Sequence, residues 1–244
     1  MGIDPDWSRI GCAGGLSEHI PILLAQLVSK DAVVRERAFM TLVHDLAWNE
    51  NAYEATPYAI CRIVHDLRSI ETPDPALLLT LLRRLGNAEA ASPDYIQWRG
   101  EPTNLIVLCR QLLEAHLDLY VRFLDDSKSK TGALDVITSF RLNSQSAEKA
   151  LKDAMGRETS SEGRAQFVEA INDLREWNQA TEAVDAPSLP EGYLEKRLEL
   201  RRDQTAFLAN PDRRKIAAPG ELSYFALRSR LLGVVIRALR RASS

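Results

Sequence analysis

The chain has 244 residues, of which 45% are hydrophobic and 27% charged, with a net charge of −3 at pH 7. This profile fits an ordinary globular protein of one large or two small domains and excludes a low-complexity chain. It also excludes a membrane-spanning helix, because no apolar run reaches the roughly 18 residues that such a helix needs. Cys12, Cys61 and Cys109 are widely spaced and odd in number, which favours reduced thiols in a cytoplasmic protein over a disulfide framework.

The charge is divided unevenly along the chain. Residues 191–244 contain 12 basic and 6 acidic side chains, whereas the first 190 residues contain 19 basic and 28 acidic ones. The body is therefore acidic, with a net of −9, and the C-terminal part is basic, with a net of +6. An acidic body disfavours nucleic acid as a partner, because phosphate neutralisation dominates that affinity. It suits a basic protein partner better.

Helical spacing of apolar residues dominates the chain and strand signals are scarce, so we predict an all-α fold. Ser17, Asp31, Thr56 and Asp74 are the predicted N-caps, because each has a side-chain oxygen at the start of a helical pattern. The predicted helices span residues 17–29, 31–48, 56–69, 74–91, 103–125, 129–142, 145–156, 160–179, 190–209 and 220–241.

The connections between these helices are short and polar, which favours antiparallel neighbours. Residues 11–15 are predicted as a flexible start, and 92–102 as a longer loop. The segment 181–193 contains two prolines and a glycine and is predicted to leave the helical stack. We therefore expect a helical body over 1–180, followed by a capping helical hairpin over 181–244 that packs on it as one domain.

Helix starts recur along the chain at a nearly constant spacing. Asp31 and Asp74 are 43 residues apart, and Thr56 and Thr103 are 47 apart. This period matches two-helix solenoid repeats of the HEAT or armadillo kind.

The second predicted helix resembles the second helix of a HEAT repeat, which typically reads Asp, then Val-Arg, then Ala and Leu at helical spacing. The matching residues are Asp31, Val34, Arg35, Ala38 and Leu42. The Tyr-x-Ala-Thr segment that begins at Tyr53 resembles the opening of the next helix in small bacterial HEAT-like proteins.

This resemblance covers residues 17–179 and is strongest over 17–86. It implies a right-handed α-α superhelix, a HEAT-like solenoid of about four helix pairs, with a C-terminal helical cap. The last predicted helix, 220–241, places arginines on one face, which fits a polar cap, an anionic membrane contact or a nucleic-acid contact. We favour the cap.

Histidines are the first candidates for chemistry. Cys61 and His65 share a helix face, but a zinc site needs about four ligands, so we predict no metal site. The tetrapeptide VHDL occurs twice, around His44 and around His65. Each His-Asp step looks like a base oriented by a carboxylate, but adjacent helical residues point roughly 100° apart, so we expect the two to serve each other poorly and predict no catalysis there. No glycine-rich phosphate loop or serine elbow is present, and we predict neither a cofactor nor enzymatic activity.

Aromatic residues in predicted loops, with one neighbouring arginine, are the candidate binding residues. They are Trp48, Tyr53, Tyr95, Trp98 and Arg99. Exposed Trp, Tyr and Arg are enriched at binding hot spots, and loops on rigid scaffolds often carry function. The alternative is that these rings pack between repeats.

A helical-repeat fold with no legible active site predicts a protein-binding module. Small bacterial HEAT-like proteins are frequently found beside toxins, so the resemblance implies an immunity protein, and the acidic body suits a basic, nuclease-like toxin. One alternative is a housekeeping adaptor. Another is a HEAT-like alkylpurine DNA glycosylase, which needs a basic concave surface and so disagrees with the acidic body.

Overall fold

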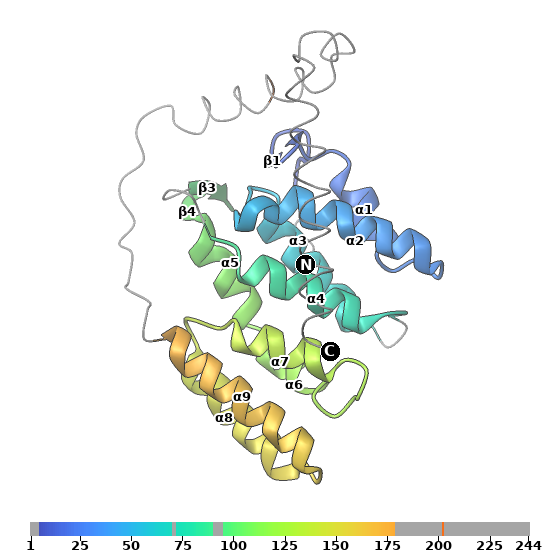
Figure 1. Cartoon of the computed structure of the whole chain (residues 1–244). Coiled ribbons are helices and arrows are strands. Elements are labelled where there is room, and N and C mark those ends of the chain that lie inside the picture. The colour runs from blue at the N-terminus through green and yellow to red at the C-terminus, as the bar shows by residue number, and fades with distance from the viewer. Residues whose placement is uncertain (1–4, 70–71, 90–94, 179–201, 203–244) are drawn as a thin grey trace, which may run out of the picture. The chain divides into compact units, whose positions relative to one another are not determined.

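The computed structural model shows a mostly helical protein (Figure 1). It describes residues 5–69, 72–89, 95–178 and 202. The chain divides into two compact units, residues 1–202 and 203–244, and the second lies wholly outside the described residues. The predicted boundary at 180–181 and, apart from residue 202, the last two predicted helices also fall outside them.

The described residues form nine α-helices, one 3-10 turn and two short antiparallel hairpins. The helices are α1 (Ile20–Gln26), α2 (Ala32–Ala47), α3 (Thr56–Leu67), α4 (Pro75–Gly86), α5 (Leu105–Glu114), α6 (Leu117–Val121), α7 (Lys130–Thr138), α8 (Ser144–Arg157) and α9 (Ser161–Asn178). The 3-10 turn is η1 (Trp48–Glu50), and the strands are β1 (Gly11–Cys12), β2 (Gly15–Leu16), β3 (Tyr95–Trp98) and β4 (Glu101–Asn104).

Within the first unit the helices pack in two layers. Helices α2, α4, α7 and α9 form one layer, in which each contacts the next (Figure 1). Helices α1, α3 and α5 form the other layer in the same way. The layers are joined because α1 packs on α2, α3 on α4, and α4 on α5.

The apolar core lies between these layers. On α2 the apolar residues spaced four apart face this core: Ala38, Leu42 and Leu46 are fully buried, and Val34 is half-buried. Burying a leucine side chain contributes roughly 1.5–3 kcal/mol. Helix α4 contributes five leucines to this core: Leu78, Leu79, Leu81, Leu82 and Leu85.

Two of the predicted N-caps are confirmed. The Asp31 carboxylate accepts a hydrogen bond from the Val33 N–H at 2.9 Å, and α2 begins at the next residue. The Asp74 carboxylate accepts one from the Leu77 N–H at 3.1 Å, and α4 begins at Pro75. Each carboxylate satisfies an N–H that has no partner within the helix.

The other two predicted caps are wrong, because their hydroxyls bond backwards to the preceding segment. Ser17 Oγ donates to the Ile10 carbonyl at 2.7 Å, and α1 begins only at Ile20. Thr56 Oγ1 donates to the Leu46 carbonyl at 2.8 Å and is already inside α3. Both residues are fully buried, so these hydroxyls fix how the chain enters the two helices.

Two segments predicted as irregular form hairpins instead. The start of the chain is fixed by tertiary hydrogen bonds, from the Ala13 N–H to the Asp45 carbonyl at 2.8 Å and from the Ala55 N–H to the Gly11 carbonyl at 3.0 Å. The predicted loop over 92–102 contains β3 and the turn into β4. Sequence patterns miss both, because strands of two to four residues show too little alternation.

The predicted helix over 103–125 is broken into α5 and α6. His116 leaves helical geometry at the break, with φ −122° and ψ 31°. The turn buries the Tyr120 ring, and its hydroxyl donates to the Leu113 carbonyl at 3.1 Å near the end of α5. This bond satisfies one of the carbonyls that a helix end leaves open.

Candidate functional site

The β3–β4 hairpin carries two predicted binding residues, Trp98 at the end of β3 and Arg99 in the turn. The strands pair as far as Trp98 opposite Glu101, so Arg99 and Gly100 form a two-residue turn. Both have positive φ, 54° and 90°, as a type I′ turn requires. A left-handed conformation costs a residue other than glycine roughly 1–2 kcal/mol. The turn therefore holds the exposed Arg99 in a conformation that asparagine or glycine adopts more easily.

A row of rings continues from this turn across the surface. The Trp98 ring lies 4.7 Å from that of Tyr58 on α3, and the Tyr58 ring lies 6.0 Å from that of Trp7. The Arg99 guanidinium lies 5.9 Å from the centroid of the Trp98 ring. We call these four residues the aromatic–arginine surface. Its rings are half-buried and its arginine is exposed, which combines fixed apolar contact area with a charged donor.

Cys61 lies near this surface, on α3 one turn beyond Tyr58. Desolvation by neighbouring groups raises the pKa of the Cys61 thiol, although the positive charge of Arg99 acts against that rise. Reactive cysteines have a lowered pKa. The shift of the Cys61 pKa therefore runs opposite to that of reactive cysteines.

The other three predicted binding residues lie apart from this row. Trp48 is 43% exposed, and its ring lies 4.4 Å from that of His44. Tyr53 is half-buried before α3, where its N–H donates to Thr56 Oγ1 at 3.0 Å. Tyr95 is only 3% exposed, so its ring belongs to the packed side of the hairpin and is not accessible to a partner.

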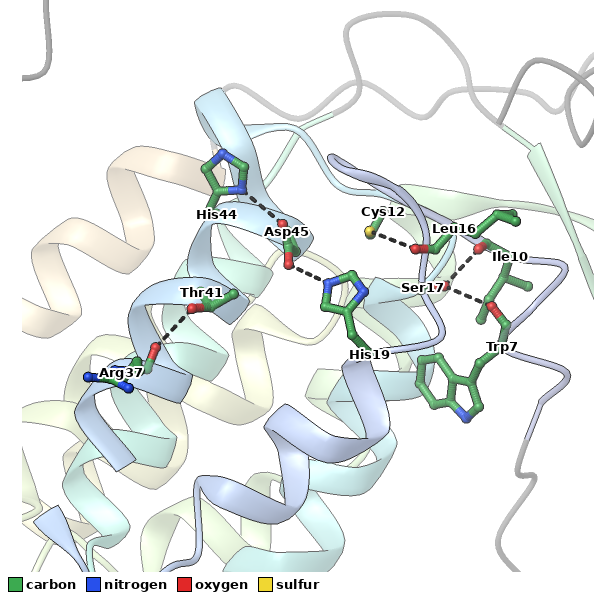
Figure 2. A network of polar contacts seen from close by, with 10 residues as sticks. All are labelled: Trp7, Ile10, Cys12, Leu16, Ser17, His19, Arg37, Thr41, His44 and Asp45. Carbon is green, nitrogen blue, oxygen red and sulfur yellow. Dashed lines mark hydrogen bonds and ion pairs between the residues drawn. The ribbon is translucent and has the colours of Figure 1, made fainter. Parts of the chain in front are cut away.

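A second cluster centres on Asp45 of α2 (Figure 2). Its carboxylate accepts a hydrogen bond from His19 Nε2 at 2.7 Å and another from His44 Nδ1 at 2.8 Å. Adjacent residues of a helix were expected to serve each other poorly, but His44 bonds to the residue that follows it. Nδ1 lies close to the His44 backbone, and the short Asp45 side chain reaches it despite the angle between the two residues.

Hydrogen bonds and burial set the charges of this cluster. Burial opposes ionisation of Asp45, yet the hydrogen bonds from His19 and His44 outweigh it and lower the pKa of the Asp45 carboxyl. The hydrogen bond to Asp45 raises the pKa of His19, against the smaller effect of partial burial. The Asp45 side chain is 8% exposed, so the cluster holds a nearly buried negative charge between two imidazoles.

The second VHDL tetrapeptide lies in a different environment. Asp66 accepts hydrogen bonds from Arg62 at 3.1 Å and from the adjacent His65 at 3.3 Å, so adjacent residues meet here as well. His65 is 81% exposed and Arg62 52% exposed. Exposed ion pairs of this kind contribute about 0–1 kcal/mol. The Asp66 side chain is 13% exposed and that of Asp45 8%, so the two copies differ mainly in their partners: Asp66 bonds to residues of its own helix, whereas Asp45 also bonds to His19 from outside α2.

Cys12 joins the Asp45 cluster as a third type of polar group. Its Sγ, a ring nitrogen of His19 and a carboxylate oxygen of Asp45 lie within 4.8 Å of one another. Thiolate, imidazole and carboxylate are the three ligand types of zinc. No sequence pattern pointed to this set, because its members come from β1, the start of α1 and the last turn of α2. Our prediction of no metal site rested on the pair Cys61–His65 alone.

No family model, curated protein or solved structure matches the chain. Among the described residues, none of the helices is both long and apolar enough to cross a bilayer.

Proposed function

We propose that the chain is a non-catalytic, HEAT-like protein-binding module. Two features of the fold support the repeat assignment: the paired packing of α1 with α2 and α3 with α4, and the continuous layer of α2, α4, α7 and α9. The assignment implies a right-handed superhelix of stacked helix pairs. In such a stack each pair buries its apolar face against its neighbours.

The aromatic–arginine surface is the observation on which the binding function rests. Arg99 lies in the two-residue turn, Trp98 precedes it at the end of β3, and the ring of Tyr58 on α3 lies 4.7 Å from the Trp98 ring. Tryptophan, tyrosine and arginine dominate binding hot spots, because they combine large apolar area with hydrogen-bonding groups. The strained conformation of Arg99 adds support, since such residues cluster where function requires them.

The partner that fits best is a basic protein, and we infer an immunity function against a basic, nuclease-like toxin. The net charge of −9 over the first 190 residues favours encounter with a positively charged surface and accelerates association. A housekeeping adaptor would use the same surface, and the identity of the partner separates the two functions.

The test is co-purification of the full chain with the product of the adjacent reading frame, followed by calorimetric titration. We expect Trp98→Ala to weaken binding at least about 30-fold, the loss typical of a hot spot of 2 kcal/mol or more. Met40→Ala is the control, since Met40 is 63% exposed on α2, outside the surface. The proposed surface is wrong if both variants bind like the wild type. The immunity function fails if the chain does not protect cells from that neighbour.

A further inference from the structure

We propose that Cys12, His19 and Asp45 form a binding site for a zinc ion, with His44 holding the carboxylate ligand in place. The proposal rests on the geometry of the cluster in Figure 2 and does not depend on the proposed function. Sulfur, nitrogen and oxygen ligands together favour zinc, whereas magnesium and calcium select oxygen ligands only.

The distances suit an ion after a small adjustment. Zinc binds sulfur at about 2.3 Å and nitrogen or oxygen at about 2.0–2.2 Å, so the ligand atoms of a tetrahedral site lie roughly 3.2–3.7 Å apart. The three candidate atoms lie within 4.8 Å of one another. His19 and Asp45 are 2.7 Å apart and need to separate by about 0.5–1 Å, which exchanges their hydrogen bond for bonds to the ion.

The backbone holds Cys12 in position on both sides. The Gly11 N–H donates to the Glu54 carboxylate at 2.6 Å, and the Ala13 N–H donates to the carbonyl of Asp45 itself at 2.8 Å. Because the bond from Ala13 joins the residue after Cys12 to the backbone of Asp45, it holds the Cys12 thiol near the Asp45 carboxylate. A metal site needs ligands held by a supporting shell in this way.

His44 supplies a hydrogen bond that holds the ligand Asp45 in place from outside the metal site. Its Nδ1–H donates to Asp45 Oδ1 at 2.8 Å, so the other oxygen, Oδ2, which lies 2.7 Å from the His19 ring, is available to the ion. Such outer-shell hydrogen bonds orient a ligand and keep it charged, and their loss typically weakens metal binding 10–100-fold.

Solvent reaches the cluster from the His19 side. The side chain of His19 is 45% exposed, whereas Cys12 is fully buried and Asp45 is 8% exposed. An ion therefore has a path to two buried ligands through one accessible imidazole. Three protein ligands leave one position of a tetrahedral ion for water on that side.

The experiment uses the full chain, reduced and stripped with a chelator, titrated with Co²⁺ as a spectroscopic probe and with Zn²⁺. We expect one ion per chain, with a thiolate-to-Co²⁺ charge-transfer band that Zn²⁺ abolishes. Cys12→Ser removes the band and weakens Zn²⁺ binding at least about 100-fold, and His44→Ala weakens it about 10–100-fold.

The matched controls come from the second VHDL helix. Cys61→Ser and His65→Ala remove the pair that sequence spacing suggests, and we expect Zn²⁺ affinity within about twofold of the wild type. Circular dichroism checks the fold of every variant. Zinc X-ray absorption of the wild type, which needs no variant, is expected to show one sulfur ligand. A wild-type chain that binds neither ion, a shell of nitrogen and oxygen only, or a Co²⁺ band that survives in Cys12→Ser overturns the site.

Discussion

His19 Nε2 lies 2.7 Å from Asp45 Oδ2, although the two residues are 26 positions apart in the chain. The contact joins the start of α1 to the last turn of α2, beside the hydrogen bond that ties Ala13 to the Asp45 backbone. Asp45 therefore links three consecutive parts of the N-terminal region, and its removal affects all of them.

Substitution of Asp45 provides the first prediction. We expect Asp45→Ala to lower the free energy of unfolding by about 1–3 kcal/mol, because it removes a nearly buried carboxylate with two hydrogen bonds. Asp66→Ala, at the corresponding position of the second VHDL tetrapeptide, is expected to lower the free energy of unfolding by less than about 1 kcal/mol. Urea denaturation with a chelator present compares the two without a contribution from bound metal. Equal losses would contradict the different roles of the two tetrapeptides.

The second prediction concerns Glu114, at the end of α5. Its buried carboxylate accepts hydrogen bonds from the N–H groups of Arg141, Leu142 and Asn143 at 2.7, 3.0 and 2.6 Å. Glu114→Ala leaves these three donors without their acceptor, and we expect a loss of about 2–4 kcal/mol in thermal or urea unfolding. Glu162→Ala, at an exposed position of α9, is the control and is expected to change stability by less than about 0.5 kcal/mol.

Substitution of Arg99, in the turn of the β3–β4 hairpin, is expected to change stability and partner binding in opposite directions. Arg99→Asn creates the Asn-Gly pair that type I′ turns prefer, so we expect stability to rise by a few tenths to about 1 kcal/mol. The same change removes the guanidinium from the Trp98 ring and is expected to weaken partner binding. Denaturation and calorimetric titration measure the two effects. A loss of stability would show that the Arg99 side chain stabilises the turn more than its φ of 54° strains it.

We expect the free energy of unfolding to depend on pH through His116. Burial, together with the positive charge of Arg68, lowers the pKa of His116 below its ordinary value of 6.5, while Asp118 acts in the opposite direction. The unfolded chain then binds more protons between the two pKa values. The contribution of His116 is fully present above pH 6.5 and is lost as the pH falls through the lowered value. Arg68 NH2 lies 2.9 Å from His116 Nδ1, consistent with a neutral ring that accepts this hydrogen bond.

Unfolding free energies of the wild type and His116→Gln, measured from pH 8 to pH 5, test this sign. We expect the wild type to lose stability relative to the variant as the pH falls below about 6.5. Arg68→Met removes the nearby positive charge, so the same comparison made in that background is expected to show a weaker pH dependence. A wild-type advantage that grows at low pH would contradict the lowered pKa.

The sequence by itself determined the helical class and the main helices, because their signals are local. The row of Ala38, Leu42 and Leu46 follows from a 3.6-residue period. Asp31 and Asp74 cap helices by bonding to N–H groups only two or three residues ahead. Trp98 and Arg99 were chosen as candidates from residue type and position in a connection, and the structure places both on the β3–β4 hairpin.

Only the tertiary structure decided which polar residues meet. Two identical tetrapeptides differ because His19 and the β1–β2 turn approach Asp45 on α2, whereas Asp66 has Arg62 from its own helix. The rings of Tyr58 and Trp98 likewise meet only because α3 and the β3–β4 hairpin lie beside each other in the folded chain. Burial and partner geometry depend on segments far apart in the chain, and no local spacing in this sequence records which segments will pack together.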